Sequence, residues 1–318
     1  MPTPPPPSPD TGTDSDTNTP LLAGKTVLIT GSTSGLGRAS ALALSRLSPS
    51  HIYISGRNTS AAQSLISQIT TLSPSVRTTF LPLDLADLSS VARAAETILS
   101  QESKLDILLA NAGIAAAPPG RTKDGYEVHF GTNHVGHALL VTKLLPLLEV
   151  CGGRVVSVTS FAFRFAGALG GIPLDGIKGK GDAGAGVWDY LMVWRWMRYA
   201  ESKLANVVWA RELARRHPGV MSVSVSPGFV ETEMLEGMRF CDRWGARAMG
   251  WLSGGMVTAE EGARNQIRAA TVEKSELVNG AVYEPVGKRL DVLPGAAADP
   301  ALGERLWEWT EKEIGSWL

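Results

Sequence analysis

A glycine-rich stretch decides how this chain folds: Thr30-Gly31-Ser32-Thr33-Ser34-Gly35-Leu36-Gly37. It follows a run of branched apolar residues at 26–30 and leads into a segment of helical period at 36–47. Glycines let a backbone turn tightly and approach a pyrophosphate, whose charge a helix N-terminus stabilises. Because the spacing is G-x3-G-x-G rather than G-x-G-x-x-G, the stretch alone also fits a plain strand-to-helix turn. The residues that we expect to hold a dinucleotide are Gly31, Ser34, Gly35, Leu36 and Gly37.

Strand and helix patterns alternate along the rest of the chain. Predicted strands lie at 26–30, 52–55, 78–81, 107–110, 155–159, 222–226 and 281–284. Helical periodicity marks 36–47, 60–72, 88–102, 124–149, 199–216, 258–271 and 303–314. This alternation, with nearly continuous apolar strands, predicts an α/β, doubly wound (Rossmann) fold: a seven-stranded parallel sheet with helices on both faces. Ligands of such sheets bind beyond the carboxyl ends of the strands.

One domain is expected over 23–318, with an insertion near 163–198 that is rich in Gly, Trp, Tyr and Met. A second Trp- and Met-rich stretch lies at 234–256. Residues 1–22 are mostly Pro, Ser, Thr and Asp, which bury too little apolar surface to offset the entropy of ordering, so a disordered tail is expected. It has no basic, apolar-centred leader, and we expect a cytoplasmic protein.

Composition narrows the function classes. The net charge is −1 and no basic stripe occurs, which argues against a nucleic-acid surface. Two cysteines, Cys151 and Cys241, cannot form a disulfide framework. The longest apolar runs fall short of the roughly 20 residues that span a bilayer, so no transmembrane segment is expected. His134 and His137 are three apart, but no cysteine or acid pattern accompanies them, so no metal site is predicted.

Several residues at the carboxyl ends of predicted strands suit a dinucleotide. An NAD site usually has an acid after the second strand, but here Arg57 follows it, placed to pair with the 2′-phosphate of NADP. A solvent-facing arginine is the alternative. Asp84 follows the third strand, and Asn111 and Gly113 follow the fourth, where they would meet the adenosine half. Asp84 could instead be a helix N-cap.

A catalytic pair is suggested by Tyr199 and Lys203, which lie four apart in a predicted helix and so share one face. A nearby ammonium favours the phenolate form and lowers the pKa of a tyrosine. Ser160 ends the fifth strand, where its hydroxyl could stabilise a developing alkoxide. Asn133 lies in the middle of a helix, where asparagine is mildly unfavourable. Each residue alone also fits an ordinary helix or turn position.

Taken in order, these motifs resemble the short-chain dehydrogenase/reductase family over roughly 24–284, with Pro227-Gly228-(x3)-Thr232 completing the series. Asn133-His134-Val135-Gly136-His137 resembles its retinol-dehydrogenase-like branch. The resemblance implies that Tyr199 is the acid/base, that Ser160 orients the carbonyl, and that Lys203 holds a ribose and tunes Tyr199. It also implies a proton-relay water at Asn133, and nicotinamide contacts at Val230 and Thr232.

Two features depart from that family. Tyr199 follows Ser160 by 39 positions, more than in most of this branch, and the inserted segment is unusually rich in Trp and Met. The insertion could be an apolar substrate lid or a small satellite core beneath long loops. Ser157, earlier in the same strand, is a lesser alternative to Ser160.

The expected function is NADP-dependent interconversion of a ketone or aldehyde and an alcohol on a bulky apolar molecule, such as a polyketide, terpenoid, steroid or retinoid. One alternative is a non-catalytic nucleotide sensor or scaffold, which need not keep all four of Asn133, Ser160, Tyr199 and Lys203. Another is an epimerase or dehydratase, but only about 30 residues follow Glu284, too few for the larger C-terminal domain of those enzymes. A homo-oligomer is left open.

Overall fold

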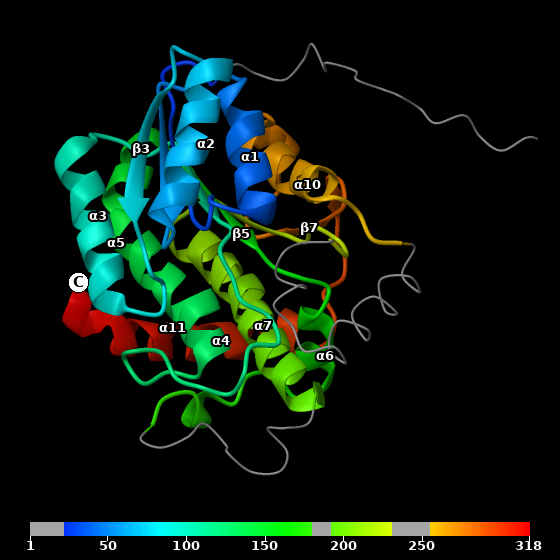
Figure 1. Cartoon of the computed structure of the whole chain (residues 1–318). Helices are drawn as coiled ribbons and strands as arrows, with labels where there is room; N and C mark the ends of the chain where they lie inside the picture. The colour runs from blue at the N-terminus through cyan, green and yellow to red at the C-terminus, as the bar shows by residue number, and fades with distance from the viewer. Residues whose placement is uncertain (1–21, 180–191, 231–254) are drawn as a thin grey trace, which may run out of the picture.

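The computed structural model describes residues 22–179, 192–230 and 255–318 (Figure 1). The tail predicted at 1–22 therefore lies outside the described residues except for Leu22, which is buried and donates its N–H to the Leu47 carbonyl at 2.8 Å. Leu22 thus belongs to the fold. Thr232, Cys241 and Trp188 also lie outside the described residues.

The described residues form one sheet of eight strands in the order β3-β2-β1-β4-β5-β6-β7-β8. The strands are β1 (Thr26–Ile29), β2 (His51–Gly56), β3 (Arg77–Pro82), β4 (Ile107–Ala110), β5 (Arg154–Val158), β6 (Met221–Val225), β7 (Val282–Glu284) and β8 (Lys288–Arg289). The seven predicted strands are present and pair in parallel. The eighth strand, β8, was not predicted and pairs antiparallel with β7. It consists of two exposed charged residues, which are too few to show the alternation of a strand.

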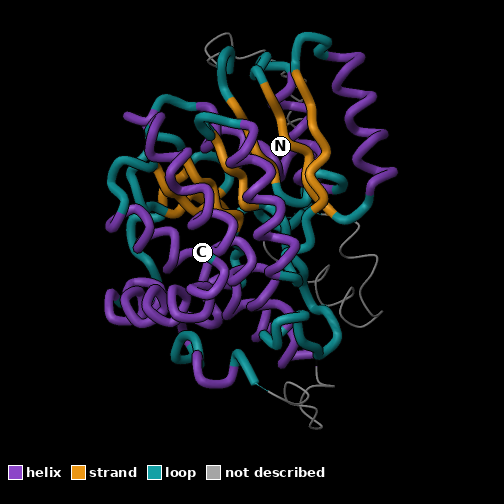
Figure 2. The backbone as a smooth tube through the Cα atoms, turned by 90° about the vertical axis from the view of Figure 1, so that its left-hand side faces the viewer, coloured by secondary structure: helices purple, strands orange, loops and turns teal. Residues whose placement is uncertain are grey.

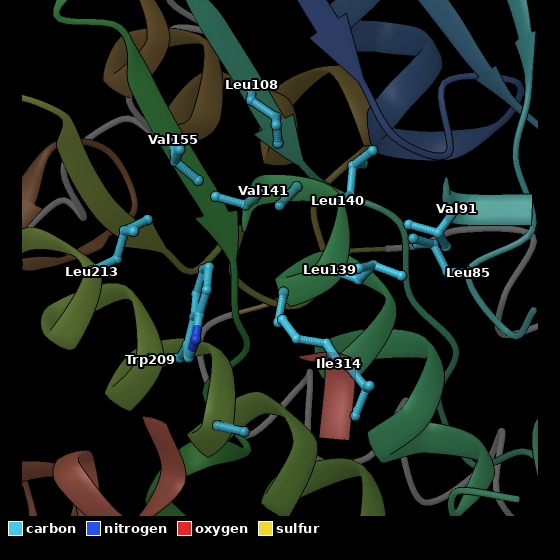
Figure 3. Close-up of a cluster of buried hydrophobic side chains, with 14 of the residues drawn as sticks. Leu85, Val91, Leu108, Leu139, Leu140, Val141, Val155, Trp209, Leu213 and Ile314 are labelled. Carbon is cyan, nitrogen blue, oxygen red and sulfur yellow. The ribbon is translucent and has the colours of Figure 1, made fainter. Parts of the chain in front are cut away.

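Helices cover both faces of the sheet (Figures 1 and 2). Along β1, Val27 and Ile29 pack into one apolar cluster and Leu28 into the other, as the alternation of side chains along a strand requires. The first cluster lies under α1 (Gly35–Ser45), α2 (Thr59–Leu72) and α10 (Ala259–Thr271). The second lies under α3 (Leu88–Gln101), α5 (Gly136–Cys151) and α7 (Met192–Arg216), and Figure 3 shows part of it. The doubly wound prediction is confirmed.

The C-terminal helix α11 (Pro300–Ile314) packs on the outer side of α7 rather than on the sheet. Trp307 stacks on Trp209 of α7, with ring centroids 5.5 Å apart and planes 13° from parallel. Trp309 meets Tyr126 and Phe130 edge-on. The stack on Trp209 holds α11 to α7, and the contacts of Trp309 hold it to the segment that carries Tyr126 and Phe130.

Three helical details differ from the sequence prediction. The predicted helix at 124–149 starts instead as α4 (Val128–Phe130), passes through a π-helical turn, η1 (Gly131–Val135), and continues as α5. A short helix, α6 (Phe163–Ala168), follows β5. Helix α7 begins at Met192, seven residues before its predicted start, because no glycine or proline interrupts the chain between them.

By length and composition, one described helical segment could cross a membrane, contrary to expectation. The segment is Val128–Cys151, 24 residues long, and its most apolar 18-residue window has a mean hydropathy of 1.3. In this fold 61 % of its most apolar window is buried inside the protein, and its leucines pack against the sheet and α3. Its apolar character is accounted for here by its position as a core helix.

We predict that stability falls as the pH is lowered from about 6.5 toward 4. Burial lowers the pKa of His134 to about 3 and that of His137 to about 4, from 6.5. Between those values the unfolded chain binds protons that the folded chain does not. The free energy of unfolding therefore drops with falling pH, by at most about 1.4 kcal/mol per pH unit for each histidine. Urea unfolding across this range should show a shallower pH dependence in His134→Leu; an unchanged slope would contradict the prediction.

Candidate active site

The loop between β1 and α1 turns at two glycines with positive φ, Gly31 (+63°) and Gly35 (+47°), a conformation that side chains other than hydrogen disfavour. A Cβ at Gly37 would overlap the carbonyl oxygen of Gly31. A Cβ at Gly31 would lie 2.9 Å from the Cβ of Ala112, which follows β4. Three backbone segments therefore meet here with no side chain between them.

A groove of about 290 Å³ opens beside this loop. Its walls come from the segments that follow β1, β2, β3 and β4, all at the carboxyl edge of the sheet. The predicted dinucleotide residues that line it are Gly31, Ser34, Gly35, Leu36, Gly37, Arg57, Asp84, Asn111 and Gly113. The glycines leave backbone at the surface of the groove, which suits an anionic, extended ligand.

Arg57 and Asp84 line the groove from neighbouring loops. Arg57 is exposed and directly follows β2. The Asp84 carboxylate accepts the N–H of Ala86 at 3.0 Å, whereas the N-cap of α3 is Asp87, which accepts the N–H groups of Ser89 and Ser90. The N-cap alternative for Asp84 is therefore wrong, and this residue belongs to the groove wall.

Asn111 ties β4 to the glycine loop. Its Nδ2 donates to the carbonyl of Thr30 at 2.8 Å, and its Oδ1 accepts from Nε2 of Gln266 at 3.1 Å. Gln266, in α10, also donates to Ser40 of α1 at 2.7 Å. Sequence reasoning did not find Gln266, because it lies 155 positions from Asn111 and belongs to no local motif.

Helix α7 places Tyr199 and Lys203 beside the groove. Lys203 Nζ donates to the carbonyl of Val158 at 2.8 Å and lies 5.9 Å from the centre of the Tyr199 ring. A Cβ at Gly113, in the groove wall, would be only 3.2 Å from Nζ. Burial lowers the pKa of Lys203 to about 8, so the ammonium is the main form at neutral pH. A buried cation thus stands between the groove and the phenol.

The side chain of Ser160 lies near the Tyr199 phenol. Burial raises the pKa of the Tyr199 phenol, and a hydrogen bond with the Ser160 side chain opposes that rise. Ser157, by contrast, is buried inside β5, in register with Ala110 and Ser224 of the neighbouring strands. The geometry therefore brings Ser160, rather than Ser157, to the phenol.

Comparison with known proteins agrees with this arrangement. The family model described as short chain dehydrogenase matches residues 25–171. Human retinol dehydrogenase 12 is 34 % identical over 92 % of this chain and 87 % of its own length. Mouse polyprenol dehydrogenase is 33 % identical over 89 % of this chain and 82 % of its own length. The chain is a short-chain dehydrogenase/reductase. It belongs to the retinol-dehydrogenase-like branch of that oxidoreductase family.

Solved structures of the family share the fold. A protein from Beutenbergia cavernae, described as an NAD(P)-dependent gluconate 5-dehydrogenase with bound NADP at low occupancy, aligns with a TM-score of 0.63 and 25 % identity. The alignment covers 84 % of this chain and 96 % of that one. The fold of this chain is thus that of a solved short-chain dehydrogenase.

In this dehydrogenase Asn133 lies in the π-helical turn η1 and is fully buried. Its Oδ1 accepts the N–H of Ile114 at 2.8 Å, and its Nδ2 donates to the carbonyl of the same residue and to Ser202 Oγ, each at 2.9 Å. Ser202 Oγ donates in turn to the Tyr199 carbonyl at 2.7 Å. Asn133 therefore joins the segment after β4 to the turn of α7 that carries Tyr199.

The remaining predicted residues lie around this centre. A Cβ at Gly262 of α10 would meet side-chain atoms of both Val230 and Leu36 within 3 Å, so Val230 packs beside the glycine loop of the dehydrogenase. Trp196 packs edge-on against Tyr199 at 5.8 Å, and the Arg198 guanidinium lies 4.5 Å from the Trp194 ring centre. Neither tryptophan belongs to the two apolar clusters of the described residues. The described side chains contain no group of three or more metal-ligating residues.

We predict that Gly37→Ala weakens dinucleotide binding by about tenfold or more, since the new methyl group would push Gly31 out of place. Gly219→Ala is the matched control, because a Cβ there meets nothing within 4 Å. Titration of both variants with NADH and NADPH, followed by protein fluorescence, gives the measurement. Wild-type affinity in Gly37→Ala would show that the close approach of the loop does not matter.

Proposed function

We propose that this dehydrogenase interconverts a ketone or aldehyde and an alcohol on a bulky, mostly apolar small molecule, with NADP as the cofactor. The observation that carries the proposal is the position of the buried Lys203 ammonium, which lies against the groove wall at Gly113 and 5.9 Å from the centre of the Tyr199 ring. An acid/base group beside a dinucleotide groove serves hydride chemistry, and a sensor or scaffold has no need of it.

The residues present fit a nicotinamide dinucleotide. Side chains at Gly31, Gly37 and Gly113 would each intrude on neighbouring groups, so the groove depends on their absence. The pyrophosphate would be held at the N-terminus of α1, where unpaired backbone N–H groups favour negative charge. When bound, the cofactor supplies or accepts the hydride. Lys203 would hold the adjoining ribose, and Val230 would contact the nicotinamide half; Thr232, for which the family resemblance implies the same contact, lies outside the described residues.

The protein itself moves the proton. In reduction, the Tyr199 phenol donates its proton to the substrate oxygen, and in oxidation the phenolate removes it. Ser160 donates a hydrogen bond to that oxygen and stabilises its developing charge. Burial raises the pKa of Tyr199 and the Ser160 hydrogen bond opposes that rise. An ammonium at Lys203 would favour the phenolate form further.

Preference for NADP rests on Arg57. It lines the groove directly after β2, where no acid is present to accept a ribose 2′-hydroxyl. A guanidinium pairs well with a phosphate because its N–H groups are planar and always charged. The NADP bound in the Beutenbergia relative supports the same preference.

An apolar substrate is supported by the aromatic side chains around Ser160 and Tyr199. The ring centroid of Phe161 lies 5.8 Å from that of Phe165 and 6.1 Å from that of Phe229. Trp196 packs edge-on against the Tyr199 ring. The relatives named for retinol and polyprenol act on long apolar alcohols. Trp196 lies at the start of α7. On sequence alone the insertion fits either a lid or a satellite core, and residues 180–191 of it lie outside the described residues.

We predict that Arg57→Ala raises the dissociation constant for NADPH by about tenfold or more, because a charge-assisted pair contributes about 1.5–3 kcal/mol. The constant for NADH should change little. Arg46→Ala removes another exposed arginine, one that does not line the groove, and serves as the control. A wild-type protein that prefers NADH in a parallel titration would overturn the cofactor assignment.

Tyr199→Phe keeps the ring and its packing but removes the transferable proton. We expect turnover of an apolar aldehyde such as retinaldehyde to fall by about 10²-fold or more, with NADPH affinity retained. Tyr126→Phe removes a hydroxyl that is bonded to Glu313 instead, and should leave turnover unchanged. Steady-state kinetics on the three proteins measure the effect, and near-normal turnover in Tyr199→Phe would falsify the mechanism.

A further inference from the structure

His137 connects two parts of the site that the mechanism uses separately. It lies in α5, one turn after Asn133, and is 5 % exposed. Its Nδ1 lies 2.9 Å from the carbonyl oxygen of Asn133, and its Nε2 lies 2.8 Å from Oγ1 of Thr30 at the end of β1. One imidazole therefore bridges the π-helical turn and the strand that leads into the glycine loop.

These contacts determine the proton positions in the bridge. A carbonyl oxygen only accepts hydrogen bonds, so Nδ1 of His137 carries a proton and donates it to Asn133. Burial lowers the pKa of His137 to about 4, and the nearby Lys203 charge acts in the same direction. The ring is thus neutral, and its unprotonated Nε2, 2.8 Å from Oγ1, accepts the hydroxyl proton of Thr30. The carbonyl oxygen of Leu109, a second acceptor within reach of this hydroxyl, lies farther away, at 3.2 Å.

The Thr30 hydroxyl then orders the segment after β4. With its proton directed to His137, Oγ1 has lone pairs left for the N–H groups of Asn111 at 2.9 Å and Ala112 at 3.0 Å. Both residues line the dinucleotide groove, and Ala112 is the residue that packs against Gly31. The hydrogen bond from Thr30 to His137 therefore helps to fix the shape of the groove.

The hydrogen bond from His137 to the Asn133 carbonyl affects the acid/base pair. The Asn133 carbonyl that His137 holds belongs to the same residue whose side chain fixes Ile114 and Ser202. Ser202 bonds to the Tyr199 carbonyl. A shift of the π-helical turn would therefore reach the turn of α7 that carries the phenol.

We infer that His137 is a positioning residue: as the Nδ1–H tautomer it locks the turn carrying Asn133 to Thr30, and so sets the dinucleotide groove in register with Tyr199 and Lys203. The inference rests on the proposed roles of that pair. His137 touches none of the reacting atoms, and it acts through Thr30 on one side and through Asn133 on the other.

His134 offers a matched comparison within the same helical segment. It is also buried, also neutral, and also bonded to a threonine hydroxyl, Thr310 of α11, at 3.0 Å. Thr310 lies on the C-terminal helix and does not line the groove. His134 also packs edge-on against Trp209 of α7, ten positions after Tyr199, with ring centroids 6.1 Å apart. Loss of His134 therefore removes a comparable structural contact, but its hydrogen bond to Thr310 reaches neither the groove nor the acid/base pair.

The test compares His137→Leu with His134→Leu. Both should lower the melting temperature, but only His137→Leu should weaken NADPH binding and reduce kcat with retinaldehyde, each by about tenfold. Two conservative variants distinguish the hydrogen bond to Thr30 from the hydrogen bond to Asn133. His137→Gln reaches far enough to accept from Thr30 and should restore NADPH affinity more than kcat. His137→Asn can still donate to the Asn133 carbonyl and should restore kcat more than affinity.

A double-mutant cycle gives a second readout. If the Thr30 hydroxyl acts through His137, Thr30→Val should weaken NADPH binding, and the double variant Thr30→Val/His137→Leu should be no worse than the poorer single variant. NADPH affinity does not require the Tyr199 proton, so failure of the proposed chemistry would appear in Tyr199→Phe and not in this cycle. The inference is overturned if His137→Leu keeps NADPH affinity and kcat within twofold of His134→Leu, or if the cycle is additive.

Discussion

The loops that follow β1 and β4 leave the sheet in opposite directions, and the site depends on the gap between them. The chain first builds β2 and β3 on one side of β1 and then crosses over to build β4 on its other side. The direction in which strands are added to the sheet therefore reverses between β1 and β4. Such a reversal leaves a crevice at the carboxyl edge. The glycine loop can line that crevice only because Gly31, Gly37 and Ala112 approach one another at backbone distance. A larger side chain at either glycine would push these segments apart.

A buried ammonium is the second constraint. Moving a charge out of water is unfavourable, and the lowered pKa of Lys203 expresses that cost. The carbonyl oxygen of Val158, at the end of β5, accepts a hydrogen bond from Lys203 Nζ at 2.8 Å and so stabilises the protonated lysine. Thr159 Oγ1 donates to the Lys203 carbonyl at 2.9 Å, which holds the same turn of α7 against that strand. The strand end that positions Ser160 therefore also positions its partners, and the three groups stay together as one unit.

Much of this arrangement follows from local pattern. The glycine spacing, the strand runs and the i,i+4 pair of Tyr199 and Lys203 depend on residues close in sequence, so the seven parallel strands and the family could be predicted. The eighth strand could not, since Lys288–Arg289 is too short for a periodicity. The early start of α7 was also missed, because its tryptophans and methionines suit a lid as well as a helix.

By itself the sequence determined the glycine turn after β1 and the shared helix face of Tyr199 and Lys203, because glycine conformation and helical spacing are properties of the local chain. Only the tertiary structure decided which of them act together. The π-helical turn at Asn133, the link from Asn111 to Gln266 and the bridge of His137 to Thr30 join residues between 4 and 155 positions apart. The two long-range hydrogen bonds, Thr30 to His137 and Gln266 to Asn111, arise from how α5 and α10 pack on the sheet. No local pattern encodes them, since burial and partner choice depend on the whole fold.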